Sequence, residues 1–212
     1  MTRRVPILAT LVVVAAVATM IWLGVWQLQR RAEKDALLAL YRANLGKPAV
    51  SFPILPPVAD EMLFRRSSLV CLEVGGWQME GGRAADGSTG YRHIARCRTG
   101  AEGPGALVDM GLAADPKVKP VWNGGPVSGT ITTAPSHESA LGRLLGGGGA
   151  PRVAMLVSAT PAPGLKASAP PSTDNVPNNH LAYAFQWFFF AAVALVIYVL
   201  ALRRRNRRSD AA

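Results

Sequence analysis

The segment VPILATLVVVAAVATMIWLGVWQLQ, residues 5–29, has no charged side chain over 25 consecutive positions. A helix of about 20 mainly apolar residues is long enough to cross the hydrocarbon core of a bilayer. A second uncharged run begins near residue 175, and its apolar part is also long enough to span. The sequence therefore predicts transmembrane helices over residues 5–29 and 180–202. A cleaved signal peptide ending near Ala18 is the alternative for the first run, although the apolar character continues for about two more helical turns.

Basic side chains flank both apolar runs and contribute to a net charge of +10. Arg3 and Arg4 precede the first run, and the tail of residues 203–212 contains five arginines. The positive-inside rule keeps such a tail in the cytoplasm, so both termini are expected there and the middle of the chain outside. We expect a multi-pass protein of the bacterial inner membrane, with a periplasmic central domain and membrane lipid as a partner. The middle shows no basic stripe, which argues against a nucleic-acid partner.

Between the two spans, the sequence predicts one more helix and then a β-rich domain. Apolar residues recur at helical spacing within residues 30–47, which indicates a membrane-proximal helix. Short β-like runs separated by Gly and Pro predict an external β-rich domain over residues 60–160, built as an antiparallel barrel or sandwich. These runs are residues 68–74, 91–97, 106–110, 127–133 and 153–159. Residues 161–178 are rich in Pro, Ala and Ser, which predicts an extended tether back to the membrane.

The chain contains no recognisable catalytic motif. It has no nucleophile elbow, no His-Glu-x-x-His sequence and no phosphate-binding loop, so we do not expect an enzyme. His93 lies in a strand-like run, where an ordinary hydrogen-bonded imidazole is favoured over a metal ligand. Cys71 and Cys97 also lie in strand-like runs, and both a disulfide and two buried thiols are open for them. A copper site at these cysteines is a weaker option, since the close spacing of a copper-binding pair is missing.

Polar residues at the outer ends of the two spans are the strongest candidates for function. In the second span, His180, Tyr183, Ala184 and Trp187 occupy positions i, i+3, i+4 and i+7, so they share one helix face. An aromatic belt at the membrane interface is the alternative interpretation. Histidine and glutamine at the edge of a span are costly unless they are used, which favours a functional site.

Two motifs frame this region. The first is Gly-x-Trp-Gln-x-x-Arg-x-x-x-Lys, formed by Gly24, Trp26, Gln27, Arg30 and Lys34. The second is Asn-x-His-x-x-Tyr-Ala-x-x-Trp, formed by Asn178, His180, Tyr183, Ala184 and Trp187. Both motifs resemble the signatures of the Surfeit-locus cytochrome oxidase assembly factor family. The middle of the chain resembles the family more loosely, and the family's usual Arg-Gly-Trp after one strand is here Met110-Gly111-Leu112.

The resemblance implies a factor that assembles haem–copper cytochrome c oxidase and assists delivery or insertion of haem a into the large, haem-bearing subunit. It also implies that His180 ligates the haem iron, for which imidazole is an ordinary axial ligand. We further expect Arg30 or Arg31 to pair with the haem propionates. Three aromatic side chains are expected to flank the porphyrin, and two small residues to leave room for it or for a close helix approach: Trp26, Tyr183 and Trp187, and Gly24 and Ala184.

Two other functions remain open at this stage. One is a purely structural membrane chaperone that clamps an oxidase subunit without binding haem, and this clamp should tolerate loss of His180. The other is a two-span sensor or ligand-binding membrane protein. That function requires convergent polar residues in the β-rich domain, and the sequence offers no clear set of them.

Overall fold

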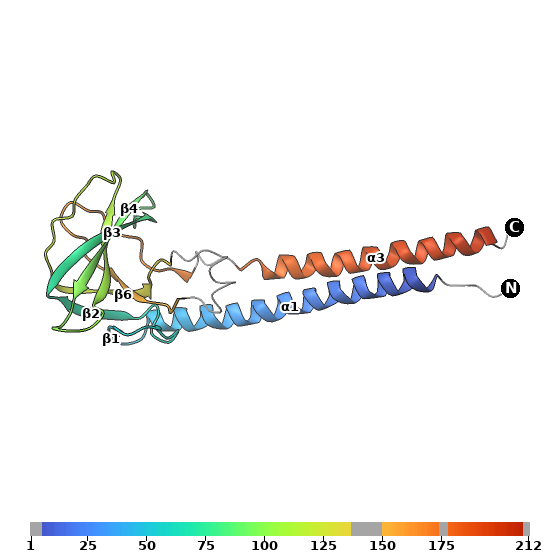
Figure 1. The fold of residues 1–212 in the computed structure, drawn as a ribbon, viewed down its shortest axis with the longest axis horizontal. Helices are drawn as coiled ribbons and strands as arrows, with labels where there is room; N and C mark the ends of the chain where they lie inside the picture. The colour runs from blue at the N-terminus through green and yellow to red at the C-terminus, as the bar shows by residue number, and fades with distance from the viewer. Residues whose placement is uncertain (1–5, 137–149, 174–177, 210–212) are drawn as a thin grey trace. The chain divides into compact units, whose positions relative to one another are not determined.

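The computed structural model describes residues 6–136, 150–173 and 178–209 (Figure 1). The chain divides into two compact units. One unit comprises residues 1–36 and 176–212 and contains two long helices, and the other comprises residues 37–175 and contains a β-sheet. This division reproduces the expected order of an apolar helix at each end of the chain with β structure between them.

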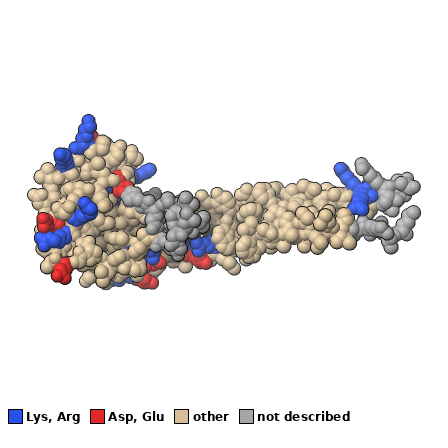
Figure 2. Space-filling model, in the orientation of Figure 1, with Lys and Arg blue, Asp and Glu red and all other residues tan. Residues whose placement is uncertain are grey.

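The two helices are α1, Ile7–Leu45, and α3, His180–Ser209. Both are long and apolar enough to cross a membrane by length and composition. The helices expected over residues 5–29 and 30–47 form one continuous helix, because Gln and Arg at the junction are good helix formers. On the face shown in Figure 2, the helices carry uncharged side chains along most of their length, and arginines appear near the end of α3.

Small residues bring α1 and α3 close together. Gly24 is buried, and a Cβ atom placed on it would lie 2.6 Å from the ring of Phe188. On α3, Ala184 and Ala191 are 1% and 5% exposed, and the seven-residue interval between them places both on one face. Small side chains at such positions let two helix backbones approach closely, which is a common way to pack helices that lie in lipid. Gly24 and Ala184 therefore serve the contact between the helices.

The second unit contains one mixed sheet of seven strands in the order β1-β2-β6-β7-β5-β4-β3. The strands are β1 Val50–Ser51, β2 Arg66–Cys71, β3 Glu73–Arg83, β4 Thr89–Arg98, β5 Ala106–Ala113, β6 Gly125–Thr133 and β7 Ala154–Ser158. The pairs β1–β2 and β5–β7 are parallel, and the other neighbours are antiparallel. The expected antiparallel barrel or sandwich is therefore wrong: this is an open, mixed sheet whose edge strands β1 and β3 do not pair.

The sheet is strongly coiled although it does not close. Cys71 on β2 and Cys97 on β4 form a disulfide with a Cα–Cα distance of 5.1 Å. These strands are second and sixth in the sheet order, and four strand spacings in a flat sheet would separate them by about 19 Å. Only Leu72 lies between the end of β2 and the start of β3, so the chain bends there from one side of the sheet to the other. This bend gives the sheet some of the curvature of a barrel, although β1 and β3 remain edge strands.

Strand β3 is longer than the sequence indicated. The pair Gly75-Gly76 looked like the end of a strand, but β3 continues through it to Arg83. The pairing register of β3 with β4 shifts between Val74 and Trp77, which is a β-bulge at the glycines. Gly76 has φ of 150°, and a Cβ atom there would meet the guanidinium of Arg96 at 2.7 Å. Glycine therefore permits the bulge without ending the strand.

The expected tether over residues 161–178 is partly folded onto the sheet. Ala162 and Ser168 are 2% and 6% exposed, and Leu112 forms an isolated antiparallel bridge with Lys166. Apolar Ala162 and Leu165 join the main core cluster, which offsets the ordering of a Pro-rich segment. Residues 161–173 thus belong to the β-sheet domain, and residues 174–177 lie outside the described part of the chain.

The last turns of α1 belong to the β-sheet domain. Tyr41 is buried and stacks on Phe64 with ring centroids 4.5 Å apart. Asn44 is fully buried, and its side-chain amide donates to the main-chain carbonyl of Leu63 at 2.9 Å. It also donates to the carbonyls of Asp60 and Glu61 at 3.3 and 3.2 Å. These bonds hold the loop before β2 against the end of the helix.

Candidate functional site

A hydrogen bond joins the two sequence motifs within the helical unit. Nδ1 of His180, the first residue of α3, lies 2.7 Å from Oε1 of Gln27 on α1. An amide oxygen only accepts hydrogen bonds, so Nδ1 carries the proton and donates it to Gln27. The lone pair of the imidazole is then on Nε2, the tautomer that ligates a metal through Nε2. The side chain of His180 is thus oriented by a partner from the other helix.

A second hydrogen bond connects the same ends of the two helices. The Asn178 amide donates to Oδ1 of Asp35 at 2.8 Å. The other carboxylate oxygen of Asp35 lies 3.4 Å from Nε of Arg31, one helical turn earlier on α1. Asp35 was not singled out in the sequence, although its i+4 spacing from Arg31 is the usual signal of a helix ion pair. Through Asn178, Asp35 holds the start of α3 next to the motif on α1.

The four residues predicted to share one face of α3 lie in two different environments. His180 and Ala184 are partly or fully buried against α1, whereas Tyr183 is 52% exposed. Trp187 is partly buried, and its ring meets that of Phe190 edge-on at 6.4 Å. On α1, Trp26 is 42% exposed. The contact between α1 and α3 therefore positions His180, while Trp26 and Tyr183 remain available to a further apolar molecule.

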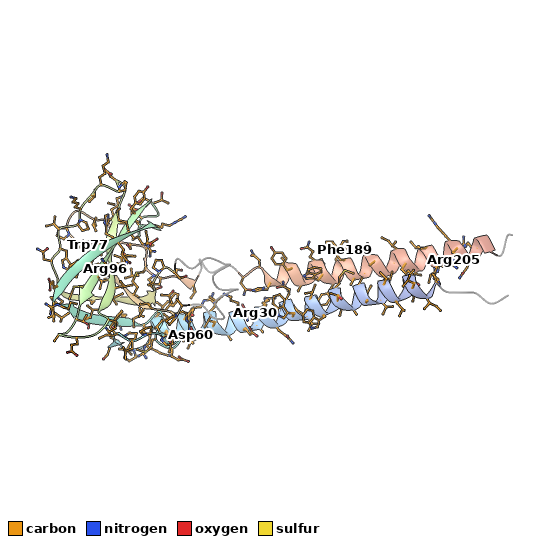
Figure 3. All side chains as sticks on the ribbon, viewed as in Figure 1. Arg30, Asp60, Trp77, Arg96, Phe189 and Arg205 are labelled. Carbon is orange, nitrogen blue, oxygen red and sulfur yellow. A yellow bond between two sulfur atoms is a disulfide. The ribbon has the colours of Figure 1, made fainter. Side chains whose placement is uncertain are left out.

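The predicted anion-binding residue Arg30 is already engaged. Its guanidinium forms an ion pair with Glu33 one turn later on α1, and both side chains are more than half exposed. Exposed pairs of this kind contribute little stability, so they exchange partners readily. Lys34, the last residue of the first motif, is partly buried. Figure 3 shows Arg30 on α1 and Phe189, which is 57% exposed, on α3.

The β-sheet domain contains a separate buried charge. The Asp109 side chain on β5 is fully buried and accepts hydrogen bonds from the Ser168 hydroxyl at 2.8 Å and the Gly111 amide at 3.1 Å. Burial raises the pKa of Asp109, and these two hydrogen bonds and Arg92, 3.6 Å away, oppose that rise. Burial also lowers the pKa of His93 on β4, against the opposing charge of Asp109. The hydrogen bond between Asp109 and Ser168 holds the segment after β7 against the sheet.

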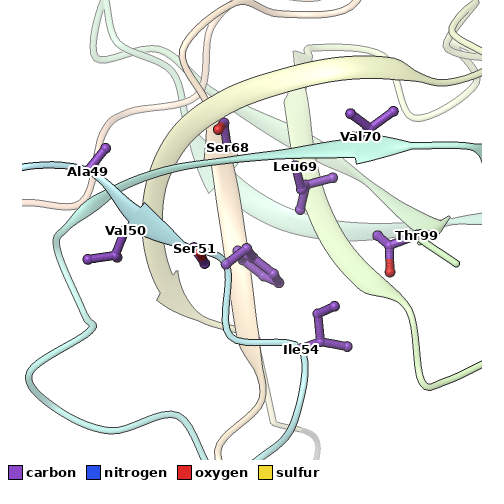
Figure 4. Close-up of a pocket in the computed structure, with 9 residues that line it drawn as sticks. Ala49, Val50, Ser51, Ile54, Ser68, Leu69, Val70 and Thr99 are labelled. Atoms are coloured by element: carbon purple, nitrogen blue, oxygen red, sulfur yellow. The ribbon is translucent and has the colours of Figure 1, made fainter.

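A hollow of about 480 Å³ lies beside the short edge strand β1 (Figure 4). Its lining residues are Ala49, Val50, Ser51, Phe52, Ile54, Ser68, Leu69, Val70 and Thr99. None of these side chains is ionisable, so the lining offers no general acid or base to activate the hydroxyls of Ser51, Ser68 or Thr99. Across the described residues, no group of three or more His, Cys, Asp or Glu side chains is placed to hold a metal ion.

Two long apolar helices at the ends of the chain, linked by a hydrogen bond between two motifs, define a class of helix-anchored β-domain proteins. Comparison with protein families matches the SURF1 family over residues 14–192, which is most of the chain. The chain therefore belongs to the SURF1 family, as its motifs indicated. This family is known for cytochrome oxidase assembly. A search of curated proteins finds no match.

Proposed function

We propose that this protein assists haem a delivery to, or insertion into, the large subunit of a haem–copper cytochrome c oxidase. Membership of the SURF1 family supports the link to oxidase assembly. We also propose that both helices cross the bacterial inner membrane, with the termini in the cytoplasm and the β-sheet domain in the periplasm. The apolar helices and the arginines at the end of α3 support this topology. No enzymatic activity is part of the proposal.

The hydrogen bond between Gln27 and His180 is the observation that carries the haem role. Metal-ligating histidines commonly donate the other ring N–H to a fixed acceptor, which sets the tautomer and orients the ring. Gln27 is such an acceptor, at 2.7 Å from Nδ1. Neutral imidazole with a lone pair on Nε2 is the ordinary form that binds haem iron. The donor set at this end of the helices therefore fits haem as a cargo.

The neighbouring side chains suit a flat, apolar and acidic cargo. The exposed rings of Trp26 and Tyr183 supply apolar surface at the same end of the helix pair as His180. Arg30 can exchange Glu33 for a propionate, because a guanidinium pairs well with carboxylates. Transient delivery requires such a site to release its cargo, and a half-exposed site held by one ligand is consistent with release.

The test is a haem titration of the full chain in detergent, followed by visible absorption, with oxidase assembly measured in cells. The variants are His180→Ala and, as a matched control, His137→Ala at another of the three histidines. We expect a Soret band in the wild type and the control, and its loss or shift in His180→Ala together with poor oxidase assembly. If His180→Ala assembles oxidase normally and no variant binds haem, the haem role is wrong and a structural clamp is favoured.

The topology is tested separately with proteases added to intact spheroplasts. We expect cleavage within the β-sheet domain and protection of both termini. Cleavage of the arginine-rich C-terminus in intact spheroplasts would overturn the orientation without affecting the haem proposal.

A further inference from the structure

Three side chains with soft or borderline donor atoms lie in one row across neighbouring strands of the sheet. Met79 on β3 pairs directly with His93 on β4. On the other side of β4, Arg92 pairs with Leu112 and Ile94 with Asp109, so the register shifts there and both Met110 and Gly111 on β5 lie opposite His93. Met110 packs in the same core cluster as Ala95, two positions after His93 on β4. Residues directly opposite each other in a sheet project from the same face, with Cβ atoms about 5 Å apart. Met79, His93 and Met110 therefore form one row on one face.

The imidazole in the middle of this row has an unexplained nitrogen. His93 is 1% exposed, and among the described residues its Nε2 has no hydrogen-bond partner. A buried polar nitrogen without a partner is costly and uncommon in folded proteins. The ring of His93 meets the indole of Trp77 at 6.5 Å and 75°, and Trp77 contacts Trp122 in the same way. The nitrogen without a partner thus belongs to an imidazole that packs against an aromatic pair.

We propose that Met79, His93 and Met110 form a binding site for a copper(I) ion, which Trp77 covers with its indole ring. Thioether sulfur selects soft cations such as copper(I), and imidazole is a common copper ligand. An indole ring beside a bound cation adds a favourable cation–π interaction. Harder divalent ions prefer oxygen ligands, whereas the three side chains of the row offer thioether and imidazole donors.

The site has an entrance and stands apart from the cysteines. Met79 lies on the edge strand β3 and is 51% exposed, whereas Met110 is 3% exposed. An ion can therefore be taken from solution by Met79 and passed to the buried His93 and Met110. Cys71 and Cys97 are joined in a disulfide and provide no thiolate. Figure 3 labels Trp77, which lies on the edge strand β3 and whose ring contacts that of His93.

The test is anaerobic competition between the full chain and the copper(I) chelator bicinchoninate, with preformed copper(I) and the disulfide intact. We expect one copper(I) per chain. Met79→Leu should weaken binding at least tenfold, and because Met79 is half exposed this variant keeps the fold. Met110→Leu should do the same, and Met155→Leu is the control, a buried methionine in a second core cluster with Ile94. Leucine conserves the side-chain volume but removes the sulfur.

Two further measurements separate this site from other sources of copper binding. His180→Ala should bind copper(I) as the wild type does, because the proposed haem ligand is in the other unit. Copper K-edge absorption should show mixed sulfur and nitrogen ligands, and copper(I) should quench tryptophan fluorescence less in Trp77→Phe. Absence of stoichiometric binding, or equal affinity in Met79→Leu and the wild type, would overturn the proposal even if Met110→Leu failed to fold.

Discussion

Oε1 of Gln27 lies 2.7 Å from Nδ1 of His180, although 153 positions separate the two residues in the chain. Each residue belongs to a different sequence motif, so the contact turns two separate patterns into one site. Its consequence is chemical as well as structural: the acceptor on α1 decides which nitrogen of the α3 imidazole is free to bind a metal.

Replacing Gln27 with leucine should weaken haem binding by about 10–100-fold, because the tautomer and orientation of His180 are no longer fixed. Gln27→Glu keeps an acceptor at this position and should retain binding with an altered spectrum, since a charged acceptor forms a stronger hydrogen bond than an amide. Haem titration by visible absorption measures both effects. Equal affinity in Gln27→Leu and the wild type would show that Gln27 has no role in positioning the ligand.

Loss of the disulfide should destabilise the β-sheet domain. Cys71 and Cys97 are separated by 26 positions, and closing a loop of this size stabilises a domain by about 3–4 kcal/mol in the chain-entropy account. The Cys71→Ser/Cys97→Ser variant should therefore unfold at a clearly lower denaturant concentration, as followed by tryptophan fluorescence. A reducing agent should shift the wild type to the same midpoint and leave the variant unchanged, and a failure of the reductant to move the wild type would contradict this account.

Asn44→Ala should also destabilise this domain, by about 1–3 kcal/mol, because three main-chain carbonyl groups, of which that of Leu63 is buried, lose their donor. Asn44→Asp is the informative companion variant. It has a similar shape, but a carboxylate accepts hydrogen bonds and would face carbonyl oxygens, so we expect an effect at least as large. Thermal unfolding monitored by circular dichroism provides the comparison. A melting temperature unchanged in Asn44→Ala would argue that solvent replaces the amide without cost.

Alkaline pH should weaken the domain through Tyr41. Burial, together with the charge of Asp60 and the hydrogen bond to it, raises the pKa of Tyr41 from 10.0 to about 12. The folded state thus holds the phenol proton more tightly than the unfolded state, so this stability is complete below pH 10 and is lost as the pH rises towards 12. Absorbance of tyrosinate at alkaline pH should show a late ionisation, near pH 12, in the wild type that is missing in Tyr41→Phe. The same late ionisation in the variant and the wild type would contradict its assignment to Tyr41.

Several features of the fold could be read from the sequence, because each depends on a local pattern. The absence of charge over residues 5–29 and 180–202 predicts two long apolar helices, and the structure contains them. The Gly and Pro spacing predicts short strands, and six of the seven strands in the described part of the chain overlap the predicted runs. The run over residues 68–74 is divided at Leu72 between β2 and β3. The pair Gly75-Gly76 predicts the end of a strand but lies inside β3, because a glycine pair can mark a bulge as well as a turn.

Features that depend on distant contacts could not be predicted in this way. The parallel pairing of β5 with β7 brings residues more than 45 positions apart together, and nothing in either strand encodes that neighbour. The Pro-rich composition of residues 161–173 predicts an extended chain, but the burial of Ala162 and Leu165 depends on a core formed by other segments. In the candidate site, helical periodicity placed His180 and Tyr183 on one face, yet only the approach of α1 separates their environments.

The bond between Cys71 and Cys97 ties the maturation of the protein to its location. The two sulfur atoms join strands that are four places apart in an open sheet, so the coiled form of the domain is reinforced only after oxidation. Thiols stay reduced in the bacterial cytosol and become oxidised after export. A copy retained in the cytosol would keep a looser domain and be a better substrate for proteases. With the topology proposed above, only exported copies of the protein would gain the full stability that the disulfide provides.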